Sequence, residues 1–302
     1  MNSQQLGIEA TSVTSAANNP WDSVDYAWLG DALPNVALSK SQARVLEVIA
    51  RNPQLSSYAD IAEIAQRSDV NNSTVVRTAQ RLGYRGWPDL QRELRSRYLV
   101  MISTEDTLNE HGEHRSPLHD ALNHDIENLR LTLESNTADD VESAIAALAG
   151  GKSITVIGIG SFAGPASVMA HLGSTMGYPI SLESRAGVHF ASAANNLGPG
   201  DVLVVINMWR SVKQIILTAE AAKQAGATVV AISDMRRGRL AAAADHLLIV
   251  ASEGISFFQS VTAANSMVYG LLAGMEAAHP ERSRAAIRRT QQLWKDLDVY
   301  LD

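Results

Sequence analysis

The chain of 302 residues is long enough for about two domains of roughly 150 residues each. Its composition, 46% hydrophobic and 19% charged, is typical of a water-soluble globular protein. No apolar run approaches the roughly 20 residues that span a bilayer, which excludes a membrane-embedded protein. The absence of cysteine excludes disulfides, thiolate metal sites and cysteine nucleophiles, and we expect a cytoplasmic location.

The net charge of −7 is unevenly distributed along the chain. Between Ser39 and Tyr98 there are ten basic and six acidic residues, about +4, against fifteen basic and twenty-six acidic residues elsewhere, about −11. A small basic segment in an otherwise acidic chain indicates a module that binds a polyanion such as DNA.

Residues 1–34 are expected to form a disordered or weakly ordered N-terminal arm. The first nineteen are rich in Ser, Thr, Asn, Gln and Ala. They lack the basic start and the continuous apolar stretch of a secretion signal.

Residues 35–101 are predicted to form an all-α helix-turn-helix domain. Ser39 can cap a helix that runs to about Ala50, and a short helix over about 59–66 follows after Asn52–Pro53. A polar turn at 67–70 then leads into a helix from about Asn72 to Leu82. Two short helices across a tight turn are typical of this motif. A helix over 88–101 completes the domain, and the polar segment 102–115 is expected to be the linker.

The helix over residues 72–82 has one apolar and one polar face. Steps of about 100° place Val75, Ala79 and Leu82 in one arc and Ser73, Arg77 and Gln80 in the opposite arc. Asn, Gln and Arg are side chains that can bond bidentately to adenine or guanine. The candidate DNA-binding residues are therefore Asn72, Ser73, Thr74, Arg77, Gln80 and Arg81. The alternative is an amphipathic helix whose polar face is only solvated.

Residues 38–94 resemble the N-terminal domain of RpiR-type (MurR/RpiR) transcriptional regulators. The resemblance spans the whole module and includes TVVR at Thr74–Arg77 and LGYRGW at Leu82–Trp87. It implies a DNA-binding domain of about five helices, with the helix from Asn71 to Leu82 in the major groove. Asn71 stands where the family usually has a serine cap, and asparagine caps a helix equally well.

Residues 116–302 are predicted to form an α/β three-layer domain with a parallel sheet. Two helices over 116–134 and 137–149, the second opened by the capping pair Thr137 and Asp140, precede the sheet. Short β-branched runs at 154–157, 202–206, 229–232 and 246–250 alternate with alanine-rich helical stretches, which indicates a sheet covered on both faces. Two long helices, over about 256–278 and 281–300, close the chain.

Residues 153–251 resemble the sugar isomerase (SIS) domain that RpiR-type regulators carry, a flavodoxin-like fold that usually binds phosphosugars. The resemblance includes Ser233–Asp234, Leu240 and Ala244–Asp245. It implies binding of a carbohydrate derivative. A GxG turn at Gly158–Gly160 also suggests a Rossmann dinucleotide site, but the third glycine, Gly164, falls one position late.

The phosphate cradle that the resemblance implies, SxSGxT after the third strand, is replaced by NMWRSV at Asn207–Val212. The hydroxyls are lost, but a guanidinium stands at a helix start whose amides favour an anion. We therefore expect a small anionic effector such as a carboxylate. The candidate effector-binding residues are Ser161, Phe162, Glu183, His189, Asn207, Trp209, Arg210 and Ser211. The alternatives are a pocket lost to Trp209, and purely structural roles for Glu183 and His189.

Two further expectations concern side chains outside these motifs. Phe257 and Phe258, in a stretch similar to one found in some RpiR-type regulators, are expected to pack in the core or in a dimer interface rather than against a ligand. The eight histidines are scattered, without the spacing of a metal site, so neither a metal nor a cofactor is expected.

These features predict a DNA-binding transcription regulator without catalytic residues, with repression favoured over activation. A homodimer or homotetramer on an inverted-repeat operator in double-stranded DNA is expected, because one short recognition helix reads few bases. No membrane partner is expected. Two alternatives stay open: an isomerase-class enzyme, since the fold alone does not separate the two functions, and a protein whose SIS domain only dimerises.

Overall fold

The computed structural model describes residues 38–111 and 116–300, so the predicted N-terminal arm lies outside the described residues. The chain divides into two compact units, one ending at Trp87 and one starting at Pro88, here called the N-terminal and the C-terminal unit. In the described ranges no helix is both long and apolar enough to cross a membrane. The expected division after residue 101 stays a prediction, and the structure groups the helix before it with the C-terminal unit.

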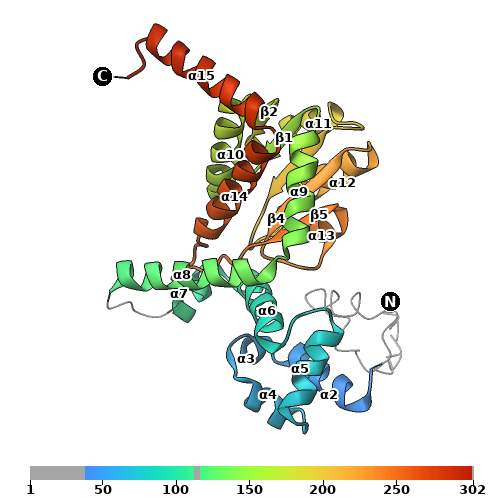
Figure 1. Cartoon of the computed structure of the whole chain (residues 1–302). Coiled ribbons are helices and arrows are strands. Elements are labelled where there is room, and N and C mark those ends of the chain that lie inside the picture. Colours follow the sequence, from blue (N-terminus) through green and yellow to red (C-terminus); the bar gives the residue numbers. More distant parts are fainter. Residues whose placement is uncertain (1–37, 112–115, 301–302) are drawn as a thin grey trace, which may run out of the picture. The chain divides into compact units, whose positions relative to one another are not determined.

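The N-terminal unit is a small helical cluster of α2 (Lys40–Arg51), α3 (Pro53–Tyr58), α4 (Ile61–Arg67) and α5 (Asn72–Arg81) (Figure 1). Helices α2, α4 and α5 contact one another, and their inward side chains are almost fully buried: Val45, Leu46, Ile49, Ile64, Val75 and Ala79. The predicted Ser39 cap of α2 is confirmed and forms a full capping box with Gln42. Helix α3 was not predicted. Proline can mark the end of one helix or occupy the first position of the next, and Pro53 was interpreted only as an end.

The turn between α4 and α5 is held in place by α2. Asp69 has a left-handed backbone with φ of 51°, and its carbonyl accepts a hydrogen bond of 2.7 Å from the Arg44 guanidinium. Asn71 then caps α5, accepting from the Thr74 amide at 2.9 Å. The substitution of asparagine for the usual serine therefore preserves the cap, and the start of α5 is fixed by local hydrogen bonds.

The C-terminal unit starts with helices and continues as an α/β sandwich (Figure 1). The leading helices are α6 (Trp87–Met101, of which all but Trp87 belongs to this unit), α7 (Thr104–His111), α8 (Pro117–Ser135) and α9 (Ala138–Gly150). The sandwich then contains β1 (Ile154–Ile157), η2 (Gly160–Phe162), α10 (Ala163–Thr175), β2 (Ile180–Glu183), α11 (Val188–Asn195), β3 (Val202–Ile206), α12 (Lys213–Gln224), β4 (Thr228–Ser233), α13 (Arg239–Ala243) and β5 (His246–Ile249). Helices α14 (Thr262–Ala278) and α15 (Pro280–Asp296) follow.

The five strands form one parallel sheet in the order β2-β1-β3-β4-β5, which is the flavodoxin-like order. Val156 of β1 lies level with Leu182 of β2 and with Val204 of β3. Because all strands point the same way, every strand ends at the same edge of the sheet. The predicted fold class, a helical domain followed by an α/β three-layer domain, is confirmed, as is the capping box of Thr137 and Asp140 on α9.

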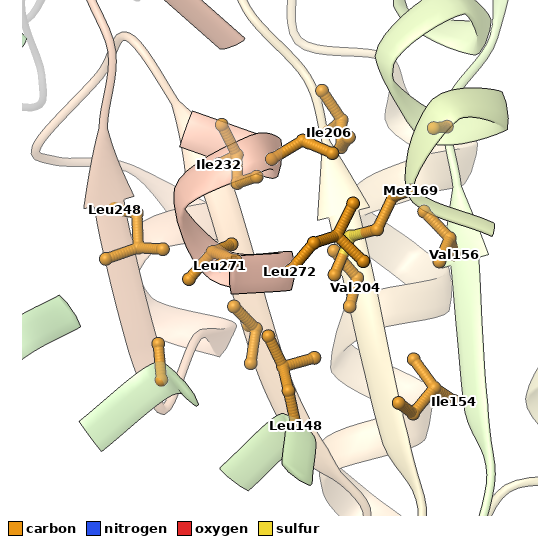
Figure 2. Close-up of a cluster of buried hydrophobic side chains, with 14 of the residues drawn as sticks. Leu148, Ile154, Val156, Met169, Val204, Ile206, Ile232, Leu248, Leu271 and Leu272 are labelled. Atoms are coloured by element: carbon orange, nitrogen blue, oxygen red, sulfur yellow. The ribbon is translucent and has the colours of Figure 1, made fainter. Parts of the chain in front are cut away.

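Alternate side chains of the strands enter two separate apolar cores. Figure 2 shows the first, in which Val156, Val204, Ile206 and Ile232 pack beneath Leu271 and Leu272 of α14, with Leu148 of α9 and Met169 of α10 in the same cluster. On the other face, alternate residues of the same strands pack with α11, α12 and α13 through Phe190, Ile215 and Leu240. Continuous apolar strands are therefore explained by burial on both faces.

Three details differ from the predicted elements. The segment expected to be an unpatterned linker contains α7, whose start is capped by Ser103 accepting from the Asp106 amide at 3.0 Å. The long helix expected from residue 256 begins only at Thr262. Phe257 and Phe258 therefore lie in a loop, 44% and 50% exposed and edge to face with each other, so the expectation that they pack in the core of the chain is wrong.

Candidate DNA-reading helix and effector site

The predicted polar face of α5 is exposed. Ser73, Arg77 and Gln80 are exposed, whereas Val75, Ala79 and Leu82 on the opposite side are fully buried, so the predicted separation of the two faces is confirmed. Asn72, Ser73 and Thr74 form the first helical turn, and Thr74 is half-buried. The outer face of α5 is therefore available to a large partner while its inner face holds the helix in the unit.

Arg77 lies along its own helix in the free protein. Its Nε donates to the Ser73 carbonyl at 3.2 Å and its Nη2 donates to Ser73 Oγ at 3.0 Å. The hydroxyls of Ser73 and Thr74 in turn donate to Asn71 Oδ1. These contacts are local and exposed, so Arg77 can leave them to meet an acceptor pair on a guanine edge at little cost.

A shallow hollow lies beside this face. It is lined by Ser39 and Gln42 at the start of α2 and by Arg77, Gln80 and Arg81 of α5. Every one of these side chains can donate a hydrogen bond and two are cationic, which suits phosphate and base-edge acceptors. The structure thus places Arg77, Gln80 and Arg81 of the predicted set on one surface. It adds Ser39, which was expected only to cap a helix, and Gln42, which the sequence analysis did not single out.

The predicted effector residues lie at the edge of the sheet where the strands end. Ser161 and Phe162 belong to η2 after β1, His189 belongs to α11, and Asn207, Trp209, Arg210 and Ser211 lie between β3 and α12. Glu183 is the last residue of β2 itself. Strands β1 and β3 are neighbours at the point where the chain order reverses, which is where such sheets bind ligands.

The turn after β1 is tightly built. A Cβ on Gly158 would lie 2.5 Å from the Phe162 carbonyl oxygen, so this position requires glycine. Ser161 is exposed, whereas the Phe162 ring is half-buried and packs against the core that Figure 2 shows. Ser161 can therefore offer its hydroxyl and nearby backbone amides to a ligand, and Phe162 acts mainly as packing.

Glu183 is bound to a neighbour that the sequence did not single out. Arg185 donates to Glu183 through its amide at 2.9 Å and through its guanidinium at 3.0 and 2.9 Å. These hydrogen bonds hold the pKa of Glu183 below its usual range, with a smaller contribution from His189. Glu183 therefore stays ionised, and an anionic ligand at this end of the sheet would meet it as a repelling charge.

Asn207 holds the loop between β3 and α12 through two hydrogen bonds within the loop. This side chain is buried; its amide group donates to the Arg210 carbonyl at 3.4 Å and its oxygen accepts from the Val212 amide at 3.3 Å. Both polar ends of Asn207 are thus occupied within the loop. Asn207 therefore shapes the loop.

Trp209 occupies a strained position in that loop. Its φ of 58° is left-handed, which is rare for a bulky residue, and its indole Nε1 is buried without a hydrogen-bond partner. The Arg210 guanidinium stacks over the indole at 5.0 Å, and its Nη2 lies 3.4 Å from the Ile102 carbonyl just after α6. Among the described residues Arg210 has no carboxylate partner, so it is an available cation on a strained loop.

Asp234, directly after β4, holds the backbone of Trp209. The Trp209 amide donates to both Asp234 carboxylate oxygens, at 3.0 and 2.9 Å. Ser252 after β5 donates to the same carboxylate at 2.9 Å, and Ser96 of α6 does so at 3.1 Å. Burial raises the pKa of Asp234, and these hydrogen bonds oppose that rise. The sequence had indicated Asp234 only as part of a family pattern.

The predicted effector residues thus form two groups. Asn207, Trp209 and Arg210 are in contact with one another, while Glu183 and His189 interact electrostatically across β2 and α11. Within the described ranges no hydrogen bond joins these two groups, and Ser161 and Ser211 are exposed without a side-chain partner. The structure therefore supports one organised centre, around Trp209 and Arg210, more strongly than the full set.

A small cavity lies beside Asp234. Its volume is about 60 Å³, enough for about four waters or a very small polar molecule. Its lining includes Arg95 and Ser96 of α6, Asp234, and Ser252 and Glu253 after β5. Arg95 pairs with Glu253 at 2.7 Å, so these two charges of the lining compensate each other. The cavity borders α6 and the centre around Asp234, and it lies within the C-terminal unit.

Comparison with protein families identifies both parts of the chain. Residues 34–99 match the family described as a helix-turn-helix domain of the rpiR family, and residues 147–274 match the SIS domain family. An uncharacterised HTH-type transcriptional regulator from Caldanaerobacter subterraneus subsp. tengcongensis is 24% identical over 227 residues, which are 73% of this chain and 78% of that protein.

Two solved structures are similar in fold to this chain. The sugar isomerase domain of an RpiR transcription factor from Sphaerobacter thermophilus is 26% identical with a TM-score of 0.57, over 59% of this chain and 99% of that chain. NanR of Vibrio vulnificus, complexed with ManNAc-6P, shares the fold at 19% identity with a TM-score of 0.59, over 90% of this chain and 98% of that chain. The chain therefore contains a helix-turn-helix domain of the rpiR family followed by a SIS domain.

Proposed function

We propose that this protein is a DNA-binding transcription repressor controlled by a small anionic metabolite. The observation that carries the DNA-binding part is the exposed face of α5 with Ser73, Arg77 and Gln80, on a helix whose opposite face is buried in an rpiR-family domain. We propose repression over activation because a regulator that binds across a promoter blocks access of the polymerase sterically. Activation would in addition need a surface that contacts the polymerase. A reporter gene under the selected operator should be expressed less when the protein is present.

The operator is expected to be an inverted repeat, because two copies of α5 read twice the sequence that one short helix can read. Selection of bound DNA from a random-sequence pool with the full-length protein measures this directly. We expect two related half-sites in opposite orientation, with centres about one helical turn, or a multiple of it, apart. Enrichment of a single asymmetric half-site would contradict the two-fold arrangement.

The effector is proposed to bind at the loop between β3 and α12. Arg210 supplies a planar guanidinium without a carboxylate partner in the described residues, and Ser211 and free amides at the start of α12 supply further donors. Trp209 occupies space that the glycine and hydroxyls of a phosphate cradle would leave open. A carboxylate fits this donor set better than a dianionic phosphate, which needs more donors.

We propose that Asp234 couples the conformation of this loop to the position of α6. It is bonded at the same time to the Trp209 amide and to Ser96 of α6, and Arg210 reaches the Ile102 carbonyl just beyond that helix. A ligand that pulls Arg210 or Trp209 toward itself therefore changes contacts that hold α6. Helix α6 directly follows the helix-turn-helix segment, so the two functions would be coupled through a short, continuous set of bonds.

Replacing Arg210 with alanine is expected to abolish the effector response while leaving DNA binding intact, because Arg210 is exposed and lies outside the N-terminal unit. Calorimetric titration with a panel of short mono- and dicarboxylic acids, and with ManNAc-6P as the sugar phosphate that NanR binds, measures the response. Tight binding of ManNAc-6P that is unchanged in Arg210→Ala would overturn this assignment of the site. Arg185→Ala, at the other group, is the matched control.

Two alternative functions predict different results with the same panel of compounds. An isomerase would interconvert aldose and ketose phosphates, which requires a phosphate anchor and a general base near the carbon acid; the loop 207–212 lacks the hydroxyls of the usual anchor. A protein whose SIS domain only dimerises would show no heat of binding with any member of the panel. Turnover of a sugar phosphate would support the isomerase. The absence of binding by every compound of the panel would support the protein whose SIS domain only dimerises.

A further inference from the structure

Helix α8 presents an apolar stripe to solvent. Five large apolar side chains lie along one side of the helix at the spacing of successive helical turns. Their exposed fractions are 74% for Leu118, 55% for Leu122, 64% for Ile126, 37% for Leu129 and 81% for Leu133. Exposed apolar patches of this length on one element mark interaction sites more often than incidental surface.

The inward face of the same helix is polar. The Asp125 carboxylate accepts from hydroxyls at the start of α14, Asn128 donates to the Glu253 carbonyl at 2.8 Å, and Thr132 Oγ1 accepts from the Ala251 amide at 2.9 Å. The hydrophobic effect acting on a lone chain would turn the apolar stripe inward. Specific hydrogen bonds fix the opposite orientation, so α8 is built to offer its apolar side to something else.

The spacing along the stripe is symmetric about its centre. Leu118 and Leu133 lie eight and seven residues from Ile126, and Leu122 and Leu129 lie four and three residues from it. A second α8 packed antiparallel, with Ile126 next to the two-fold axis, would place Leu118 against Leu133 and Leu122 against Leu129. Such self-complementarity is what a two-fold interface between identical chains requires.

Charges along the stripe fit the same arrangement. The same antiparallel pairing puts His124 level with Glu127 of the other helix and Arg130 level with Ala121, so no two like charges lie level with each other. The five side chains expose on the order of 500 Å² per chain, a large part of the roughly 800 Å² per partner in a standard stable interface. The stripe can therefore form the core of a dimer contact.

We propose that the α8 stripe, Leu118 to Leu133, binds the same stripe of a second copy of this chain in an antiparallel, two-fold contact. This deepens the dimer that the proposed function needs, by naming its surface, and it does not depend on DNA binding. The other possible occupants are the N-terminal unit and residues 1–37 of the same chain. Neither explains the symmetric spacing about Ile126.

The first test is the mass of the full-length protein at micromolar concentration, measured by sedimentation or light scattering. Ile126→Glu would place two carboxylates at the apolar centre, and we expect dimerisation to weaken at least about 100-fold, so that the mass of the assembly halves. Leu217→Glu, an equally drastic change at the 44% exposed Leu217 of α12, should keep the wild-type mass. A monomeric wild type, or an Ile126→Glu protein with wild-type mass, would overturn the proposal.

The second test does not depend on how well a charged variant folds. The chain contains no cysteine, so a single introduced cysteine can only form a disulfide with its copy in another chain. Ile126→Cys should cross-link to a covalent dimer under mild oxidation, because both copies meet at the axis. Leu118→Cys should cross-link poorly alone and well when mixed with Leu133→Cys. No cross-link for Ile126→Cys would overturn the proposed contact, whereas the DNA-binding function would still be tested separately by the selection of bound DNA.

Discussion

Replacing Asp234 with alanine is expected to lower the free energy of unfolding of the C-terminal unit by about 3 kcal/mol. Asp234 is half-buried, and its carboxylate accepts from the Trp209 amide, from Ser252 and from Ser96. Alanine would leave the Trp209 amide without an acceptor in a loop that is already strained at φ of 58°. Urea denaturation of the full-length protein, followed by the Trp signal, measures the change.

Two matched variants separate stability from coupling. Asp234→Asn keeps one carbonyl-type acceptor for the Trp209 amide and should cost clearly less than alanine. Ser96→Ala removes only the bond from α6, and it should leave stability within about 1 kcal/mol while weakening the effect of the bound metabolite on DNA affinity. If Ser96→Ala retained the full effector response, the proposed connection from Asp234 to α6 would be rejected.

Replacing Arg77 with alanine is expected to weaken binding to the selected operator by about 1–3 kcal/mol, roughly 5- to 150-fold. Arg77 is exposed and bonds only to Ser73 of its own helix, so the fold should not change. Fluorescence anisotropy with the operator at constant salt measures the affinity. The loss should be concentrated at one base pair of each half-site, because a guanidinium reads a guanine edge.

Arg51→Ala is the matched control for this measurement. Arg51 is also an exposed arginine of the N-terminal unit, at the end of α2, where it pairs with Glu47. The Arg51→Ala change removes the same charge from a position outside the exposed face of α5. It should therefore weaken binding to all DNA sequences slightly and equally. An Arg77→Ala protein that stays folded and keeps wild-type operator affinity would remove α5 from the role proposed for it.

The sequence predicted best those elements whose signals are local. The Ser39 cap and the capping pair of Thr137 and Asp140 depend on residues three apart, and both were predicted, whereas the reciprocal bond from Gln42 was not. The strands were readable because burial on both faces makes them continuous apolar runs. The start of α14 could not be read from the sequence. Ser260 and Thr262 bond to Asp125, which is more than 130 residues earlier, and that contact holds residues 256–261 as a loop.

The candidate site shows the same division. Arg210 and Trp209 were recognised because they replace a short motif, whereas the role of Asp234 depends on Ser96, which is 138 residues away in the chain. Asp234 carried one readable signal, a carboxylate directly after a buried strand at the edge where such sheets bind ligands. Nothing in the sequence pattern of α8 showed which of its faces points inward, because that is decided by hydrogen bonds to the loop after β5.

The most direct test of the central claim compares the affinity of the full-length protein for its selected inverted repeat with its affinity for DNA of the same length and scrambled half-sites, both at physiological salt. A sequence-specific regulator should prefer the repeat by about 1,000-fold or more. Equal affinity for the two DNAs, falling in parallel as salt is raised, would show that the basic N-terminal unit binds DNA only through its charge, and would contradict the proposed function.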